Sequence, residues 1–422
     1  MLAAGEIMNE KNSIDNKDTK ESSCITQFTN CNILKDGAIF VDDLCVRRGK
    51  ILNPEELFYV EKDYADVKID CAGALLAPGF IDTQINGAFG VDFSLPHNNF
   101  NESIRKVSRG LIEHGVTSYC PTIVTSPPTV YKEVMNVFSA YKTHTSNDEA
   151  TILGLHLEGP FISKEKKGAH PIECIREFPN GFKDVLDVYA NLENVSIVTL
   201  APELHKATDV ISELSQRGVA VSLGHSMADL RQGELAVQAG ATFITHLFNA
   251  MLPFHHRDPH LVGLLASEKI PEDKPIFYGM ISDGVHTHPA ALRMARRISP
   301  KGLVLVTDAV PAMGLPLGVH TLGQMKVEIT DHGAYIAGTT TLCGSTLDMN
   351  SGIKYFYKNT DSTRAEALEA ATLHPAKMLG IDHKKGSLDY GCDADLVFLG
   401  PDLSVRETYI AGKRVWSSPD IK

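Results

Sequence analysis

Four side chains that can bind a metal ion or move a proton follow short apolar runs of the sequence. Glu158 ends the run "TILGLHLE", His225 and His246 follow "VAVSLG" and "TFIT", and Asp308 follows "LVLVT". One carboxylate and two imidazoles form a three-ligand set for a divalent ion, and such a set leaves a coordination position open for water, as in hydrolytic sites. The pattern predicts a catalytic metal centre held by Glu158, His225 and His246.

The two histidines are stronger candidates than the others among the 17 in the chain, because each ends an apolar strand and the two strands are consecutive. Neighbouring strands lie about 5 Å apart, so imidazoles at their ends can share one ion. Glu158 brings a carboxylate from an earlier strand. Gly159 and Pro160 then let the backbone turn sharply behind that ligand.

Asp308 is expected beside the ion rather than among its ligands. A carboxylate there can take a proton from the attacking water, whose pKa a bound metal lowers toward about 7, and return it to a leaving amine. The residues alone leave a second interpretation open, in which Asp308 only caps the end of a strand.

Eight short apolar segments, most of them separated by stretches with helical spacing, must position these side chains. Such an alternation predicts a (β/α)8 barrel of the TIM type, with a doubly wound open sheet as the rival. Polar residues end most of the segments, and only a barrel brings all of these ends to one mouth. The predicted strands are residues 75–82, 117–122, 151–158, 195–202, 219–226, 242–249, 276–283 and 303–309, and the clearest helical stretches are 101–115, 207–218 and 229–240.

The two ends of the chain have a different pattern from its middle. Residues 1–22 are polar and show no periodicity, which predicts a disordered tail. Runs typical of β-strands fill residues 23–74 and return within 385–422. We expect these runs to form one small β-sandwich domain from both chain ends, with the barrel spanning residues 75–384.

Composition narrows the class of protein. The chain has 422 residues, 43% of them hydrophobic, and no apolar run approaches the roughly 20 residues of a membrane span. Without an apolar leader the expected location is cytoplasmic, and eight scattered cysteines without a C-x-x-C pair are expected to be reduced thiols. A net charge of −12 argues against nucleic acid as a partner.

The order of several longer motifs identifies a family. "APGFIDTQINGAFG", "GLHLEGPF", "KKGAH", "LGHS", "THLFNAM", "SDGVH", "VTDA" and "GSTL" follow one another within about residues 75–380. The chain in this respect closely resembles the N-acetylglucosamine-6-phosphate deacetylases of the amidohydrolase superfamily. That resemblance implies a barrel with a small β-sandwich and metal-dependent hydrolysis of N-acetylglucosamine 6-phosphate to glucosamine 6-phosphate and acetate, in amino-sugar catabolism.

Carried over residue by residue, the resemblance implies the same three metal ligands and makes Asp308 the catalytic acid and base. Many amidohydrolases have an H-x-H pair after the first strand and bind two metals, whereas this chain has Gln84 and Asn86 there. An amide is a weak ligand compared with imidazole, so we expect one divalent ion per chain, with Gln84 near it. Zinc is the first expectation, and iron, cobalt and manganese suit the same ligands.

The resemblance also implies contacts with a phosphorylated amino sugar. Arg257 falls where the family has an arginine that reaches the phosphate in the neighbouring subunit's site, which implies a homodimer. A guanidinium suits phosphate because it is always charged and offers paired donors. The expected substrate-binding residues are Ala169, His170, Asn249, Ala250, Arg257, His286, Leu342, Cys343 and Gly344.

Two other functions remain open. One is an amidohydrolase acting on another N-acyl or cyclic amide; those relatives usually carry a bridging lysine after the fourth strand, where this chain reads "TLAPE". The other is a catalytically inactive oligomeric scaffold. Loss of catalysis usually deletes ligands, yet the predicted ligands and Asp308 are all present.

Overall fold

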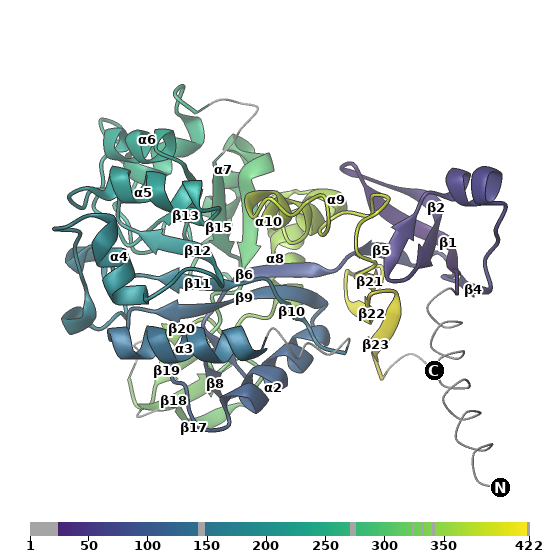
Figure 1. Ribbon diagram of the computed structural model, residues 1–422, viewed down its shortest axis with the longest axis horizontal. Coiled ribbons are helices and arrows are strands. Elements are labelled where there is room, and N and C mark those ends of the chain that lie inside the picture. The colour runs from purple at the N-terminus through teal and green to yellow at the C-terminus, as the bar shows by residue number, and fades with distance from the viewer. Residues whose placement is uncertain are drawn as a thin grey trace, which may run out of the picture.

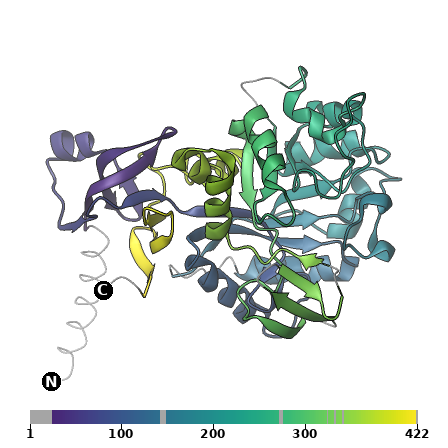
Figure 2. The same cartoon turned by 180° about the vertical axis from the view of Figure 1, so that it is seen from behind.

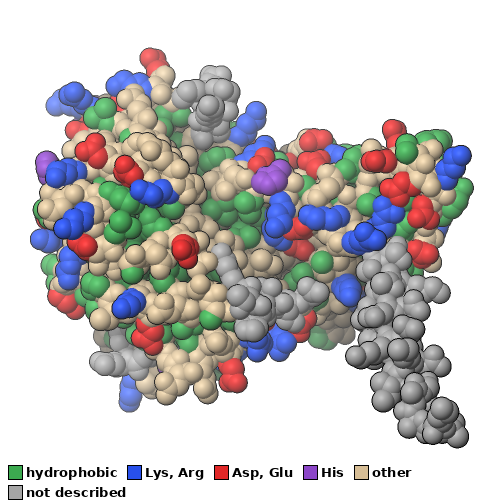
Figure 3. Space-filling model, viewed as in Figure 1, with side chains coloured by type: hydrophobic (Ala, Val, Ile, Leu, Met, Phe, Trp, Pro, Cys, Tyr) green, Lys and Arg blue, Asp and Glu red, His purple; other side chains and the backbone are tan. Residues whose placement is uncertain are grey.

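The structure is a computed structural model that describes residues 24–141, 148–270, 276–322, 325–330, 333–339 and 342–419. The tail predicted at residues 1–22 lies outside the described residues. Among the described helices, none combines the length and the apolar character needed to cross a lipid bilayer. Figure 3 shows Lys and Arg side chains interspersed with Asp and Glu over one face of the molecule.

Eight parallel strands form a barrel in the larger part of the molecule (Figure 1). Each strand pairs with the next, and backbone hydrogen bonds between the first and last strands close the ring: Asp308 N–H donates to the Gln84 carbonyl at 2.9 Å, and Asn86 N–H donates to the Ala309 carbonyl at 2.8 Å. The predicted barrel is confirmed and the open sheet is excluded. The strands, in order around the barrel, are β6 (Phe80–Ile85), β9 (Val116–Val124), β11 (Leu155–Glu158), β12 (Val195–Leu200), β13 (Ala220–Leu223), β14 (Ala241–Ile244), β15 (Phe277–Ile281) and β16 (Leu303–Val306).

Helices surround the barrel, as Figures 1 and 2 show from opposite sides. In α2 (Phe100–Ile112) the buried Ile104, Val107 and Leu111 recur at helical spacing, which gives the helix one apolar face for the sheet. A capping box between Asp229 and Gln232 sets the start of α6 (Leu230–Gln238). The main helices are α2 (Phe100–Ile112), α3 (Pro128–Tyr141), α4 (Phe182–Tyr189), α5 (Ala207–Gln216), α6 (Leu230–Gln238), α7 (Pro289–Ile298), α8 (Met349–Thr360), α9 (Arg364–Glu369) and α10 (Leu373–Met378).

A second sheet combines strands from both ends of the chain, as predicted. It appears in purple and yellow beside the barrel in Figure 1. The rings of Phe28, Phe398 and Tyr409 pack together in its core with centroids 5.1 to 5.7 Å apart. Its path runs β23 (Lys413–Ser417), β22 (Val405–Ile410), β21 (Leu396–Leu399), β5 (Leu75–Pro78), β1 (Thr26–Lys35), β2 (Ala38–Arg47) and β3 (Lys50–Leu52), with β4 (Val67–Asp70) paired to β1.

The predicted barrel strands differ from the observed ones in their bounds: the segment predicted as 151–158 is divided into β10 (Thr151–Ile152) and β11, the five after it end earlier than predicted, and the first two differ in other ways. Leu75–Pro78 was expected to begin the first barrel strand, but it pairs with β1 and β21 in the second sheet. An apolar run buried in either sheet has the same sequence pattern, so periodicity does not separate the two. The chain passes between the sheets at Gly79, where a Cβ would lie 2.0 Å from Thr117 Oγ1. The second barrel strand continues past its predicted end at Thr122 to Val124.

A small antiparallel sheet, not predicted from the sequence, is inserted between β16 and α8. It contains β17 (Gly318–Leu322), β18 (Met325–Thr330), β19 (Gly333–Ile336) and β20 (Leu342–Gly344). Leu322, Val327 and Leu342 from this sheet line the main cavity at the barrel mouth. The insertion therefore supplies an apolar wall of the site.

Candidate active site

The four predicted chemical side chains meet at the carboxyl-terminal mouth of the barrel. Glu158 is the last residue of β11, and His225, His246 and Asp308 each come two residues after a strand. The last three have positive φ angles, 49°, 25° and 46°. A side chain other than glycine adopts such angles only at a cost, and strain of this kind is concentrated at functional sites.

The turn behind Glu158 explains the Gly-Pro pair that follows it. Gly159 has a φ of +77°, and a Cβ on it would lie 2.2 Å from Thr125 Oγ1. The hydroxyls of Tyr131 and Tyr189 donate to the Gly159 carbonyl at 3.2 and 2.8 Å. Glycine is needed for both the backbone angle and the close approach. Helices α3 and α4 thus hold the backbone next to Glu158 from outside the barrel.

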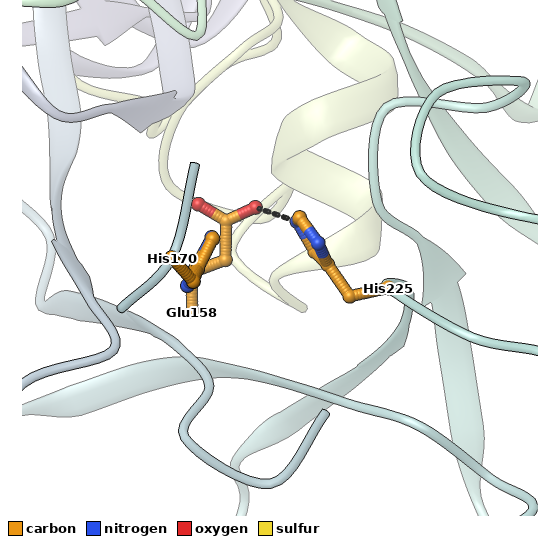
Figure 4. A group of neighbouring side chains, drawn as sticks. All are labelled: Glu158, His170 and His225. Carbon is orange, nitrogen blue, oxygen red and sulfur yellow. Dashed lines mark hydrogen bonds and ion pairs between the residues drawn. The ribbon is translucent and has the colours of Figure 1, made fainter. Parts of the chain in front are cut away.

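Three potential ligand atoms converge on one point. Oε1 of Glu158 lies 3.1 Å from Nε2 of His225 and 3.1 Å from Nε2 of His246, and the two Nε2 atoms are 3.1 Å apart. Figure 4 shows the Glu158 and His225 side chains pointing toward each other. Nδ1 of His225 is 2.8 Å from the Lys166 carbonyl, so Nδ1 carries the proton and Nε2 presents its lone pair. Such a cluster of lone pairs requires a cation.

The electrostatics of the cluster agree with this requirement. Burial alone would raise the pKa of Glu158, but hydrogen bonds with His225 and His246 outweigh burial and hold the pKa well below its ordinary value. Burial would lower the pKa of His246, and the bond to Glu158 instead raises it to about 9. In the protein alone a proton on His246 therefore balances the carboxylate, and a divalent ion would take over this role.

Amide side chains surround Asp308. Asn86 Nδ2 donates to Asp308 Oδ1 at 2.7 Å, and Gln84 Nε2 lies 3.3 Å from the same oxygen and 3.0 Å from Glu158 Oε1. Desolvation and the charge of Glu158 raise the pKa of Asp308 to about 6. A carboxylate with such a pKa is suited to exchange protons near neutral pH.

His170 is close to the same cluster. Single ligand atoms of Glu158, His170 and His225 lie within 4.8 Å of one another, and Figure 4 shows the three side chains together. Nδ1 of His170 contacts Thr125, 2.7 Å from its hydroxyl and 3.3 Å from its backbone nitrogen. Burial and the nearby His225 lower the pKa of His170 to about 3, so its ring is neutral.

A cavity of about 610 Å³ opens above these residues. Its size suits a small-molecule ligand. Most of the residues predicted to bind metal or substrate line it: Glu158, Ala169, His170, His225, His246, Asn249, Ala250, His286, Asp308, Leu342 and Gly344.

Two predicted residues, Gln84 and Arg257, are not among the described residues that line this cavity. Gln84 lies just beneath it through its bonds to Glu158 and Asp308. The side chain of Cys343 is outside the described part of the chain. Arg257 is exposed in the loop after β14 and does not reach its own chain's cavity.

Sequence reasoning missed several residues of the site. Thr125 follows β9 directly, and a correct end for that strand would have singled it out. Asp283 was predicted only as the last residue of the strand at 276–283. In the structure its Oδ2 lies 2.5 Å from Nδ1 of His286 and orients that ring. Asp92, Leu95, His97 and Ser103 line the cavity from the segment after β6, where no motif pointed to them.

Comparisons with known proteins agree with this arrangement. A model of the Amidohydrolase family matches residues 75–415. The N-acetylglucosamine-6-phosphate deacetylase of Danio rerio is 56% identical over 394 residues, which cover 93% of this chain and 97% of that protein.

Solved structures show the same fold. The crystal structure of N-acetylglucosamine-6-phosphate deacetylase from Pasteurella multocida is 32% identical, with a TM-score of 0.81 over 93% of this chain and 100% of that one. A mutant of the Mycobacterium smegmatis enzyme in complex with N-acetyl-D-glucosamine-6-phosphate is 29% identical, with a TM-score of 0.77 over 94% and 100%. The chain therefore belongs to the amidohydrolase family and, within it, to the N-acetylglucosamine-6-phosphate deacetylases.

Proposed function

We propose that this protein hydrolyses the acetamide of N-acetylglucosamine 6-phosphate, releasing glucosamine 6-phosphate and acetate in amino-sugar catabolism. The observation that carries the proposal is the convergence of three ligand atoms, 3.1 Å apart in each pair, beside Asp308 in a cavity large enough for a sugar phosphate. The names of the relatives and the bound sugar phosphate in the Mycobacterium structure support it. We place the reaction in the cytoplasm.

Glu158, His225 and His246 are the proposed ligands of one divalent ion, with zinc as the first choice and iron, cobalt or manganese as alternatives. Their donor set suits such an ion, because two imidazole nitrogens and one carboxylate oxygen already face one point, and the ion would displace the proton from His246. When bound, the ion would polarise the acyl oxygen and lower the pKa of a water molecule toward about 7.

Asp308 performs the proton transfers in this proposal. As a carboxylate it accepts a proton from the attacking water, and as an acid it returns the proton to the leaving amine. Asn86 and Gln84 both direct amide hydrogens at Asp308 Oδ1, so they hold this carboxylate toward the reacting atoms. His170 lines the same cavity and supplies a hydrogen bond to the acyl group.

An acetate-release assay tests the proposed reaction. The enzyme, stripped of metal and reloaded with zinc, would be given N-acetylglucosamine with and without the 6-phosphate, and a cyclic amide such as dihydrouracil. We expect rapid release of acetate from the phosphorylated sugar and at least a hundredfold lower kcat/KM for the unphosphorylated one. Faster turnover of the cyclic amide, or no turnover of the sugar phosphate, would contradict the proposal.

We further propose a homodimer in which Arg257 binds the substrate phosphate in the neighbouring subunit's cavity. Its exposure in the loop after β14, away from its own cavity, supports this arrangement. Within each cavity, Asn249, Ala250 and His286 would provide the remaining contacts on the phosphate side. Arg257→Ala is expected to raise KM strongly for the phosphorylated sugar while leaving the weak turnover of the unphosphorylated sugar nearly unchanged.

Mixed dimers separate this arrangement from a contact within one chain. Chains with Arg257→Ala and chains with Asp308→Asn lack an intact site when each is alone. After subunit exchange, half of the sites in a mixed dimer would combine an intact Asp308 with an intact Arg257 from the other chain, so activity should return. If a protein shown to be dimeric and to exchange subunits recovers none, Arg257 does not act across the interface.

A further inference from the structure

Thr125 contacts the imidazole ring of His170, and the proposed reaction by itself gives Thr125 no role. It follows β9 at the mouth of the barrel, and both side chains are almost fully buried, with exposed fractions of 1% and 6%. Two groups of Thr125 contact the same ring nitrogen: the backbone N–H lies 3.3 Å from His170 Nδ1, and Oγ1 lies 2.7 Å from it.

These contacts determine which nitrogen of His170 carries the proton. A backbone N–H can only donate, so His170 Nδ1 must accept. Within the described part of the chain, the Thr125 hydroxyl has one other acceptor, the Glu158 carbonyl, at the longer distance of 3.4 Å. A hydroxyl lone pair facing an unprotonated Nδ1 at 2.7 Å would be repelled, so the hydroxyl also donates to Nδ1. The single proton of the neutral ring therefore lies on Nε2.

His225, which packs against His170 with ring centroids 4.5 Å apart, has the opposite tautomer. Its Nδ1 faces the Lys166 carbonyl and must be protonated, which leaves the Nε2 lone pair for a metal ion. Two adjacent imidazoles are thus prepared for different tasks. His225 is a ligand, whereas His170 has an N–H to donate and no lone pair for the ion, even though its ring lies within reach of the cluster.

We propose that Thr125 is a positioning residue that holds His170 in the Nε2–H tautomer, so that His170 donates a hydrogen bond to the substrate's acyl oxygen as negative charge develops there. The proposal rests on the function proposed above. A donor aimed at such an oxygen typically contributes about 10² to 10³ in kcat. Thr125 acts only through His170, and its loss leaves the weaker backbone donor, so a smaller effect is expected.

Thr125→Val tests the hydroxyl with little change in shape. We expect kcat to fall by about tenfold, because the tautomer is no longer held by both donors, with KM within about twofold and the metal content unchanged. Thr125→Ser keeps the hydroxyl and should restore kcat to near that of the unchanged enzyme. Thr83→Val is the matched control, since the Thr83 hydroxyl is buried and makes no hydrogen bond within the described residues; its kcat should not change.

A double-mutant cycle with His170→Asn separates positioning from a general structural role. If Thr125 acts through His170, adding Thr125→Val to His170→Asn should cost less than about twofold further in kcat. A full additional tenfold loss in that background would overturn the proposal. So would loss of metal from Thr125→Val, because Thr125 would then support the ligands rather than His170.

An NMR spectrum of protein labelled with ¹⁵N-histidine reports the tautomer of His170 without depending on turnover. The His170 signals, identified by their absence from His170→Asn, should have the pattern of an Nε2–H tautomer, and Thr125→Val should shift that pattern. An Nδ1–H pattern in the unchanged protein would overturn the assignment. If the spectrum shows Nε2–H but no N-acetyl sugar phosphate is hydrolysed, the proposed function fails and the Thr125 contact stands.

Discussion

The two sides of the barrel mouth contain similar numbers of polar side chains but have opposite chemistry. On the side of β11, β13 and β14, one oxygen of a carboxylate and one nitrogen from each of two imidazoles converge on one point. On the seam between β6 and β16, the side chains of Gln84 and Asn86 direct amide N–H groups at Asp308. The first side is built for a cation, and the second is built for an anion.

This difference supports the proposal that the site holds one divalent ion rather than two. An amide nitrogen donates hydrogen bonds and does not bind a metal ion. Because the seam presents amide N–H groups rather than imidazoles, it does not favour a second ion. It instead keeps the Asp308 carboxylate oriented beside the ligand cluster. Gln84 and Asn86 at this seam therefore support the proposed acid and base.

The largest expected effect comes from changing one of the proposed metal ligands. Glu158→Gln removes the one negative charge among the proposed ligands and leaves an amide, which binds a divalent ion weakly. We expect loss of tightly bound metal and a fall in kcat/KM of more than about 10³, because without the ion the attacking water is not activated. Metal analysis of the purified variant and the acetate-release assay measure both.

Glu213→Gln on the exposed surface of α5 is a suitable control for this change. Among the described residues Glu213 forms an ion pair with Arg217, at 3.0 Å, and it does not line the cavity of the site. Its metal content and rate should match those of the unchanged protein. A Glu158→Gln variant that kept one ion per chain and normal activity would show that the ligands lie elsewhere.

The second largest effect is expected from changing Asp308 at the seam between β6 and β16. Asp308→Asn keeps the shape and the ligands but can neither accept nor return a proton, so we expect metal to be retained and kcat to fall by about 10² to 10⁴. The same two measurements apply. Loss of metal would make Asp308 a ligand and remove the distinction between the two sides, and near-normal turnover would put the base at another residue.

Placing histidines at positions 84 and 86 tests whether the two amides are the reason that only one ion is expected. The double variant Gln84→His and Asn86→His replaces both amides with imidazoles and should raise the metal content from about one ion per chain to about two. Its activity should fall, because Asp308 loses the Asn86 hydrogen bond at 2.7 Å. Two tightly bound ions in the unchanged protein would refute the one-ion proposal directly.

The smallest expected effect is a shift in pH dependence. Asp308 acts as a base when ionised, and burial with the charge of Glu158 raises its pKa to about 6, so activity should fall as the pH drops through the pKa. A bound cation would lower the pKa of Asp308, and with it the pH at which half of the activity is lost. Asn86 stabilises the ionised form, so Asn86→Ala should move the acid limb of kcat to higher pH. A profile of kcat against pH checks this, and an unchanged or lower midpoint would contradict it.

Much of the fold and of the site was predictable from the sequence. The barrel follows from eight apolar segments, and Glu158, His225 and His246 were predicted as ligands because each has a ligating side chain at a strand end. The sheet to which Leu75–Pro78 belongs was not predictable, since a fully buried run has the same pattern in either sheet. The inserted sheet at β17 to β20 was missed because its short strands follow no motif.

The sequence by itself determined which chemical groups the protein has and in what order its strands present them, because side-chain type and the spacing along one strand are local properties. The tertiary structure alone decided what those groups do to one another. Asn86 and Asp308 are 222 positions apart, and Thr125 and His170 are 45 apart, yet each pair is in hydrogen-bond contact. Proton positions and pKa values depend on such contacts, so they arise only when the barrel closes.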